Sequence, residues 1–298
     1  MNAAAAAAFD PARLVAMPPR HTRARHDARD AMLYALGVGV SNESATSPAT
    51  LRHAFEQQLA VLPTMAVVLA WPGFWMAEPQ YGVDWKKVLH AEQSLVLHAP
   101  LPAEGELTSQ LFIERIVDKG EAKGSILYSR REIADASGRP LATERRGTFL
   151  RGNGGHGDAL AAGVDASSFQ PLQDVPAGAP DLTVTLPTRQ DQALLYRLSG
   201  DRNPLHADPA IATGAGFRAP ILHGLCTYGV ASRALVDGLC GGDSTRFARM
   251  DCRFSQPVYP GETLATDIWR DGAGSARFRM RALERDCVVL SHGRFDFH

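Results

Sequence analysis

The C-terminal stretch from residue 247 to residue 297 decides the fold, because it holds four consecutive segments with the period of β-strands. The segments are FARMDCRFSQPVYP (247–260), ETLATDIWRDG (262–272), SARFRMRALERD (275–286) and CVVLSHGRFDF (287–297). Each alternates apolar and polar residues and ends at a turn signal, which is typical of a strand with one buried face. No helical segment separates them, so the stretch predicts an antiparallel sheet.

Helical patterns precede these strands. The segment from about residue 223 to residue 236 is predicted to be a helix that ends at Gly238. A shorter helix is expected before Gly200, with Leu194, Leu195 and Leu198 on one face. The C-terminal half is therefore expected to be a sheet packed around a helix, an α+β arrangement.

The N-terminal half repeats this order of motifs. DAMLYALGVG (30–39) parallels DQALLYRLSGD (191–201), VLPTMAVVL (61–69) parallels APILHGLCT (219–227), and PLPAEGEL (100–107) parallels PVYPGETL (257–264). Strand-like alternation follows in residues 94–102, 105–120, 123–138 and 141–152. Three matches in the same order predict a duplicated domain.

The predicted domain boundaries follow from composition. Residues 153–181 are rich in Gly, Ala, Pro and Asp without an apolar period, which indicates a linker between the halves. Residues 1–25 are expected to be a flexible tail, residues 26–152 an N-terminal domain, and residues 182–298 a C-terminal domain.

Charge, apolar runs and cysteines exclude several classes of partner. The 298 residues carry 31 Lys and Arg against 32 Asp and Glu, so no general positive field is available to hold nucleic acid. The longest apolar stretch, residues 59–72, is too short to span a bilayer and is interrupted by Pro63. Four cysteines without a C-x-x-C pair, no secretory leader and an ending that is not S-K-L favour a cytoplasmic protein.

The richest polar cluster is SGDRNPLHADP (199–209). It supplies an acid, an amide and an imidazole within six residues, Asp201, Asn203 and His206, which suits acid–base chemistry on a bound water. The alternative is an Asx-turn, in which Asp201 and Asn203 only cap the backbone and His206 is a surface residue. A metal site of Asp201, His206 and Asp208 is a third interpretation, but this spacing is not a dedicated zinc or iron pattern, so we expect no metal.

A second candidate lies in APILHGL (219–225), where the next helix begins. The backbone N–H of Gly224, aided by the helix dipole, is suited to hold negative charge that develops on a carbonyl oxygen. A glycine required only by packing is the alternative. The N-terminal copy has Ala66-Val67 where the C-terminal copy has His223-Gly224. This asymmetry favours one catalytic copy and one copy that forms a pocket for a hydrophobic group.

These motifs carry a resemblance to a known family. DRNPLHADP (201–209) followed by GFRAPILHGLCTYG (216–229) resembles the motif of MaoC-like enoyl-CoA hydratases of the hydratase 2 type. In the first half, MLYALGVG (32–39), LPT (62–64), KVLHAEQ (87–93) and VDKG (117–120) are similar to the hydratase 2 portion of peroxisomal multifunctional enzymes. The similarity extends from about residue 22 to residue 297.

The resemblance implies a double hotdog fold, in which each of two tandem domains is an antiparallel sheet wrapped around a helix. It implies hydration of 2-trans-enoyl-CoA to (3R)-3-hydroxyacyl-CoA, with coenzyme A arriving only as part of the substrate and no cofactor. Asp201, His206, Asn203 and Gly224 match the catalytic positions of the family. The N-terminal domain would then hold the acyl chain.

Four further residues are expected to contact substrate by the same resemblance. They are His90, Ala91, Lys119 and Phe254. Judged without the resemblance, His90 and Lys119 are a strand-edge histidine and a hairpin-turn lysine. His223 is expected to be structural.

Two other functions are compatible with the fold, since fold does not determine function. One is thioester hydrolysis by an acyl-CoA thioesterase, and the other is a non-catalytic acyl-CoA-binding hotdog protein. We expect a homodimer, because sheets of this kind have edges that favour pairing. Nucleic acid and membranes are not expected partners.

Overall fold

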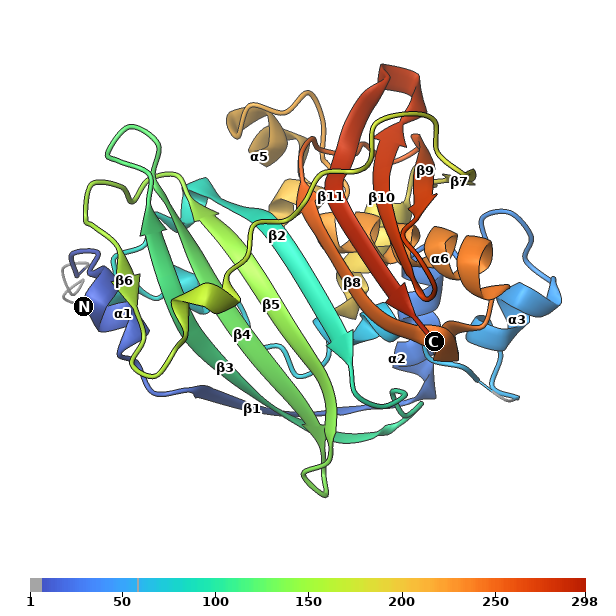
Figure 1. Cartoon of the computed structure of the whole chain (residues 1–298), viewed down its shortest axis with the longest axis horizontal. Coiled ribbons are helices and arrows are strands. Elements are labelled where there is room, and N and C mark those ends of the chain that lie inside the picture. The colour runs from blue at the N-terminus through green and yellow to red at the C-terminus, as the bar shows by residue number, and fades with distance from the viewer. Residues whose placement is uncertain (1–6, 58) are drawn as a thin grey trace.

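Strands from both halves of the chain join into one antiparallel sheet (Figure 1). The computed structural model describes residues 7–57 and 59–298, and within these ranges the sheet has 11 strands. The strand order is β1-β3-β4-β5-β2-β8-β11-β10-β9-β7, with β6 beside β3. The predicted α+β class is confirmed.

The described residues form strands, α-helices and short 3₁₀ helices. The strands are β1 (Arg20–His26), β2 (Val88–Leu97), β3 (Gly105–Asp118), β4 (Ser125–Asp135), β5 (Pro140–Leu150), β6 (Ala159–Leu160), β7 (Leu182–Pro187), β8 (Phe247–Phe254), β9 (Thr263–Arg270), β10 (Ser275–Ala282) and β11 (Cys287–Phe297). The α-helices are α1 (Pro11–Val15), α2 (Ala28–Gly37), α3 (Pro48–Ala54), α4 (Gln192–Tyr196), α5 (Pro209–Gly214) and α6 (Gly224–Cys240). The 3₁₀ helices are η1 (Pro63–Val67), η2 (Trp75–Ala77), η3 (Pro79–Tyr81), η4 (Trp85–Lys87), η5 (Ala166–Ser168), η6 (Arg197–Ser199), η7 (Pro204–His206), η8 (Ser244–Arg246) and η9 (Leu283–Arg285).

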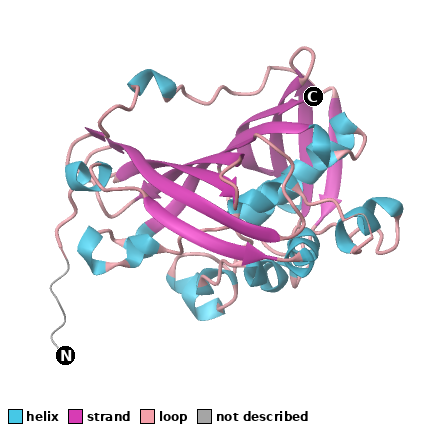
Figure 2. Ribbon diagram, turned by 90° about the horizontal axis from the view of Figure 1, so that it is seen from below, coloured by secondary structure: helices cyan, strands magenta, loops and turns pink. Residues whose placement is uncertain are grey.

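The two halves meet where β2 pairs with β8. Gln93 lies opposite Cys252 and Leu95 lies opposite Met250 in this antiparallel ladder. Most helices gather on one side of the curved sheet, and the segment that carries η5 crosses its other side (Figure 2). The largest hydrophobic core lies on the helical side and contains residues of both halves. No helix in the described ranges has the length and hydropathy of a membrane span.

The helix α6 is longer than predicted. It continues through Gly238 to Cys240 and is capped by Gly241, whose φ of 63° is the left-handed conformation that favours glycine. A Cβ on Gly238 would lie 2.8 Å from Leu182 and 3.1 Å from Val184. Gly238 therefore permits close packing of α6 on β7 and does not end the helix, so that part of the prediction was wrong.

The N-terminal counterpart of α6 is much shorter. Residues that align with the start of α6 form η1, which has five residues where α6 has 17. The chain turns sharply after η1, because Ala70 adopts a φ of 47°. The N-terminal sheet therefore packs over a short 3₁₀ helix in the place where the C-terminal sheet packs over a long α-helix.

Residues 7–25 are not the flexible tail that we predicted. They contain α1 and most of β1, and β1 pairs with β3 along seven residues. Phe9 and Leu14 are buried in a second hydrophobic core with Trp75 and Ile116. Their apolar side chains supply the packing energy that orders the segment. Residues 1–6 of the predicted tail lie outside the described residues.

The helix before Gly200 also differs from the prediction. It is split into α4 and η6, and Leu194 and Leu198 are each 52% exposed. Gly200, with a φ of 131°, does end the helical segment. The predicted linker, residues 153–181, contains only β6 and η5 as regular elements, and Phe169 packs edge-on against Tyr128.

Candidate active site

The loop between η6 and α5 presents the polar cluster. The Asp201 carboxylate accepts a hydrogen bond from the Asn203 amide at 3.1 Å, and the Asn203 side chain accepts one from the Leu205 amide at 3.0 Å. Asp208 caps α5 by accepting from the Ala210 amide. The Asx-turn contacts expected under the structural interpretation are therefore present, and they fix the shape of the loop from which His206 projects.

His206 is held in a defined orientation. Its side chain is 7% exposed, and its Nδ1 lies 2.8 Å from the carbonyl oxygen of Ile221. A carbonyl accepts only, so Nδ1 carries the proton and Nε2 carries a lone pair. Burial, more than any other cause, lowers the pKa of His206 below its usual value. The imidazole is therefore neutral at pH 7 and can accept a proton at Nε2.

His223 supports both members of this cluster. Its ring stacks on that of His206 with centroids 3.6 Å apart, and its Nε2 lies 3.0 Å from the backbone oxygen of Asp201. Burial, with a contribution from His206, lowers the pKa of His223 to about 3. The sequence predicted a structural role for His223, and its contacts show what that role is: it holds the backbone of Asp201 and the ring of His206 in place.

The cluster converges on one place. Asp201, His206 and His223 each offer a nitrogen or oxygen atom within 4.8 Å of the others. The metal group suggested from the sequence included Asp208, but Asp208 is committed to the cap of α5. One carboxylate and two imidazoles, each bound at its other nitrogen to a carbonyl, form a donor set that is chemically compatible with zinc.

Gly224 is the first residue of α6, directly after His223. A Cβ on Gly224 would lie 3.2 Å from the ring of Phe254, so any other residue would displace this ring. The backbone N–H groups of the first turn of α6 lack partners within the helix and lie at its positive end. The sequence thus places the positive tip of α6 beside the polar loop of residues 199–209, the acid–base loop.

Residues of the N-terminal half reach the same place across the seam, the pairing of β2 with β8. His90 of β2 lies 4.6 Å from Phe254 of β8, measured between ring centroids. Burial, followed by the charge of Arg146, lowers the pKa of His90 to about 3. Ala91 is the extra residue of an irregularity in the pairing of β2 with β5. The structure therefore brings His90 and Phe254 together beside Gly224.

Lys119 is placed differently. It lies in the exposed turn between β3 and β4, where its backbone amide donates to Gly124. A role in substrate binding for Lys119 stays a prediction.

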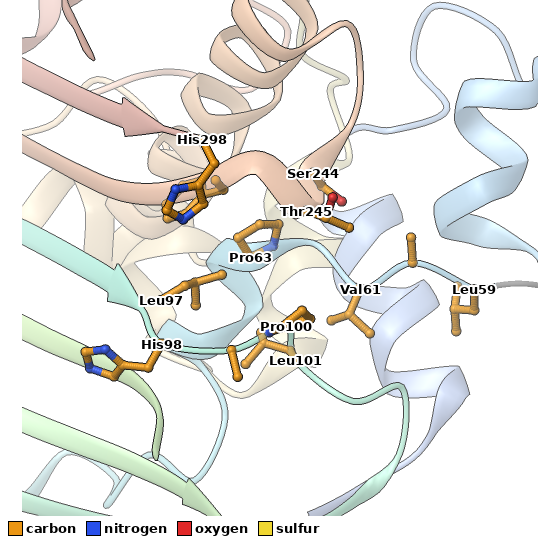
Figure 3. A pocket seen from close by; sticks show the side chains of 13 residues that line it. Leu59, Val61, Pro63, Leu97, His98, Pro100, Leu101, Ser244, Thr245 and His298 are labelled. Carbon is orange, nitrogen blue, oxygen red and sulfur yellow. The ribbon is translucent and has the colours of Figure 1, made fainter. Parts of the chain in front are cut away.

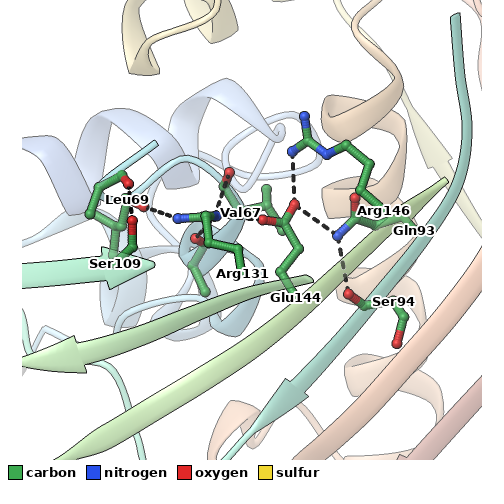
Figure 4. A network of polar contacts seen from close by, with 10 residues as sticks. Val67, Leu69, Gln93, Ser94, Ser109, Arg131, Glu144 and Arg146 are labelled. Carbon is green, nitrogen blue, oxygen red and sulfur yellow. Dashed lines mark hydrogen bonds and ion pairs between the residues drawn. The ribbon is translucent and has the colours of Figure 1, made fainter. Parts of the chain in front are cut away.

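A buried ionic network on the N-terminal sheet was not predicted (Figure 4). Arg131 donates to Glu144 at 2.7 Å, and both side chains are 1% exposed. Arg131 also donates to the carbonyl groups of Ala66 and Val67 at the end of η1 and to that of Leu69 just beyond it. Arg146 donates to the other oxygen of Glu144 at 2.7 Å. The signal in the sequence was the same parity of positions 144 and 146, which puts both side chains on one face of β5.

A separate cavity lies at the far end of the seam (Figure 3). It has a volume of about 330 Å³ and lies between the end of β2, η1 and the C-terminus. Leu59, Val61, Pro63, Leu97, Leu101 and Phe247 provide most of its apolar lining. Its lining contains none of the residues of the acid–base loop, so this cavity is not the site of chemistry.

Comparison with known proteins connects this geometry to a family. Residues 25–152 match the family described as MFE-2 hydratase 2 N-terminal domain, and residues 170–291 match the family described as MaoC like domain. The chain is 44% identical to "3-hydroxyacyl-thioester dehydratase Y" of Mycobacterium tuberculosis, over 90% of this chain and 92% of that protein.

Two further similarities agree with this. "Enoyl-CoA hydratase 2, peroxisomal" of Arabidopsis thaliana is 34% identical over 91% of this chain and 90% of that protein. The crystal structure of a MaoC-like dehydratase from Phytophthora capsici superposes with a TM-score of 0.83 at 34% identity, covering 96% of this chain and 97% of that one. The predicted double hotdog fold is confirmed.

Proposed function

The chain belongs to the MaoC-like hydratases of the hydratase 2 type, and from this premise we propose that it catalyses the reversible hydration of 2-trans-enoyl-CoA to (3R)-3-hydroxyacyl-CoA. The protein is a hydro-lyase. The observation that carries the proposal is the convergence of Asp201 and the free Nε2 of His206 beside the tip of α6.

The mechanism follows from the chemistry of these groups. The N–H of Gly224 donates to the thioester oxygen and stabilises the charge that develops there as an enolate. Asp201 and His206 hold one water, and one of them accepts its proton as the water oxygen bonds to C3 and the C2–C3 π bond opens. A proton then returns to C2. Because the two groups share one face of the substrate, the addition is syn.

Asn203 and His223 act through the shape of the loop. Asn203 fixes the turn between Asp201 and η7, and His223 holds the Asp201 backbone and the His206 ring. His90, Ala91 and Phe254 form the wall of the thioester site beside Gly224. The acyl chain extends from there into the N-terminal domain, beneath η1.

The reaction needs proton transfer and an oxyanion donor, so we propose that coenzyme A enters only as part of the substrate and that no metal or other cofactor takes part. A chelator test separates this from metal-assisted chemistry. Activity that persists after prolonged treatment with EDTA supports the proposal, and activity that is lost and then restored by zinc contradicts it.

The test of the reaction uses crotonyl-CoA. Hydration removes the enoyl absorbance without releasing free thiol, and chiral analysis of the product identifies the (3R) alcohol. Release of thiol at the rate of substrate loss would indicate the thioesterase alternative instead. Binding of acyl-CoA without turnover would indicate the non-catalytic alternative.

We also propose a homodimer in the cytoplasm. Leu194 and Leu198 on one helical face, each 52% exposed, offer an apolar surface that a second copy would cover. All four cysteines are free thiols, which suits a reducing compartment. Light scattering of the wild type and of Leu194→Glu tests the assembly, and a dimer that is unaffected by the substitution excludes this face. Cell fractionation tests the location.

A further inference from the structure

The inner face of the N-terminal sheet carries charge where the acyl chain is expected. Arg131, Glu144 and Arg146 give this face two positive charges and one negative charge. Arg146 is the more open of the two arginines, with 14% of its side chain exposed against 1% for Arg131. Its guanidinium stacks on Trp71 at 4.0 Å. An apolar chain alone does not match such a surface.

Two atoms at this place have no partner. Arg146 donates to Glu144 through one terminal nitrogen, but its buried Nε has no acceptor among the described residues. Gln93 is 1% exposed and lies directly opposite Arg146 in the β2–β5 ladder. Its amide nitrogen donates to the same Glu144 oxygen at 3.1 Å, while its buried oxygen finds no donor in residues 7–57 and 59–298. A buried donor and a buried acceptor on two directly opposed residues of the ladder thus lack partners.

The pair is within reach of a substrate bound at Gly224. Gln93 is three residues along β2 from His90, which corresponds to about 10 Å of strand. His90 contacts Phe254, and Phe254 packs on Gly224. A chain that leaves the thioester along β2, away from the turn at Lys119, passes Gln93 and Arg146 before it reaches η1.

We propose that Arg146 and Gln93 form a subsite for an oxygen on the acyl chain, so that the preferred substrates are enoyl-CoA thioesters with a hydroxyl on a distal carbon. The inference rests on the proposed hydration. A hydroxyl accepts a hydrogen bond from Nε of Arg146 and donates one to the oxygen of Gln93. A purely apolar chain leaves both buried atoms unsatisfied, which is unfavourable. A carboxylate on the acyl chain would not fit, because the Gln93 oxygen and the Glu144 carboxylate would repel it.

The first experiment needs only the wild-type protein. We expect kcat/KM to be at least about tenfold higher for one of a set of 2-trans-decenoyl-CoA derivatives, each with one hydroxyl on a different distal carbon, than for 2-trans-decenoyl-CoA itself. Equal or lower values for every derivative overturn the subsite and leave the hydratase assignment intact. Failure to hydrate crotonyl-CoA would instead overturn the proposed function.

Variants then assign the preference to these atoms. Arg146→Met keeps the stem of the side chain, and Gln93→Leu removes the acceptor; each is expected to reduce the preference to about twofold or less while hydration of crotonyl-CoA continues. Arg145→Met is the matched control, because Arg145 is the adjacent residue, points to the opposite face and is 44% exposed. A wild-type preference that survives in both Arg146→Met and Gln93→Leu contradicts the assignment.

Discussion

The two halves contribute strands to one sheet, but the sheet face that packs on α6 is apolar and the face that packs on η1 is charged. In the C-terminal half, α6 packs against strand faces that are apolar, among them Leu264, Ile268 and Phe278. In the N-terminal half, η1 ends after five residues and faces Arg131 and Glu144. Shortening a buried helix leaves carbonyl groups without partners, and here a guanidinium satisfies them. A buried guanidinium in turn requires a carboxylate.

The comparison therefore separates two tasks. The C-terminal half keeps a long helix whose tip we propose binds the thioester oxygen, and the N-terminal half has a short 3₁₀ helix over a charged sheet face. Variants can disrupt each half separately, and the predictions run from the strongest expected effect to the weakest.

The largest effect is expected from the catalytic loop of the C-terminal half. Asp201→Ala and His206→Ala should each lower kcat for crotonyl-CoA by about 10²–10⁴-fold, because each removes a proton-transfer group. The thermal unfolding midpoint serves as the readout of the fold. His98→Ala in the N-terminal half is the control, since His98 is exposed on the other copy. Wild-type turnover in either loop variant would reject the assignment of roles to the two halves.

The next effect is on stability and belongs to the N-terminal half. Arg131→Met should lower the free energy of unfolding by about 3–5 kcal/mol, because buried Glu144 would keep only Arg146 as an ionic partner and the carbonyl groups at the end of η1 would lose their donor. The double variant Arg131→Met/Glu144→Leu should recover part of this loss. Urea unfolding measures both. Arg139→Met, at an exposed ion pair with Asp135, should cost no more than ~1 kcal/mol; an equal cost at both arginines would contradict the need for the buried charge.

The third effect tests the acyl site beneath η1. Val67 is 1% exposed, and Val67→Phe fills space in which a long chain is expected. We expect kcat/KM for 2-trans-decenoyl-CoA to fall about tenfold more than that for crotonyl-CoA, since a few methylene groups correspond to roughly 1–3 kcal/mol. Val96→Phe, on a half-buried position of β2, is the control. Equal losses for the two substrates would place the acyl chain elsewhere.

The smallest effect is on pH dependence. Because burial lowers the pKa of His206, its neutral form persists below pH ~6.5, the usual histidine value. The profile of kcat/KM should therefore stay level from pH ~7.5 through ~6.5 and decline only at lower pH, where His206 gains a proton. A decline centred at or above pH ~6.5 would mean that His206 is not desolvated.

The stability of the fold should also decrease as the pH falls. His90 and His223 have a pKa of about 3 in the folded protein, so the unfolded chain binds more protons between pH ~3 and ~6.5. The free energy of unfolding should therefore fall as the pH falls below ~6.5. Urea midpoints at a series of pH values measure it, and a midpoint that rises in this range would contradict the buried neutral state.

The strands and the asymmetry of the two halves could be predicted from the sequence, but the packing contacts between distant residues could not. Alternation in residues 247–297 predicted the strands, and the missing motif at residues 66–67 predicted an asymmetric pair. The role of Gly238 depended on Leu182 and Val184, which are distant in sequence and close only in the fold. For the same reason, Phe9 and Leu14 could not be assigned to a core before β3 was placed.

The ionic network was missed for a different reason. Charged residues at alternate positions of a strand normally indicate a solvent-facing side, as at Arg145. The shared parity of positions 144 and 146 puts Glu144 and Arg146 on one face of the strand, but it does not tell whether that face is buried; the short η1, whose carbonyl groups need a donor, explains why this face carries charge. His223 was likewise recognised as structural, but its stacking on His206 depends on the path of the loop between them.

The seam between β2 and β8 has a consequence for how such a chain evolves. His90 and Phe254 meet across it, so the proposed wall of the site draws on both ancestral copies, while the loop with Asp201 and His206 comes from the C-terminal copy alone. After duplication, substitutions that change the specificity for the acyl chain can accumulate in the N-terminal copy without altering Asp201 and His206. Under the proposed function, neither half alone holds both the loop of Asp201 and His206 and the His90 side of the site.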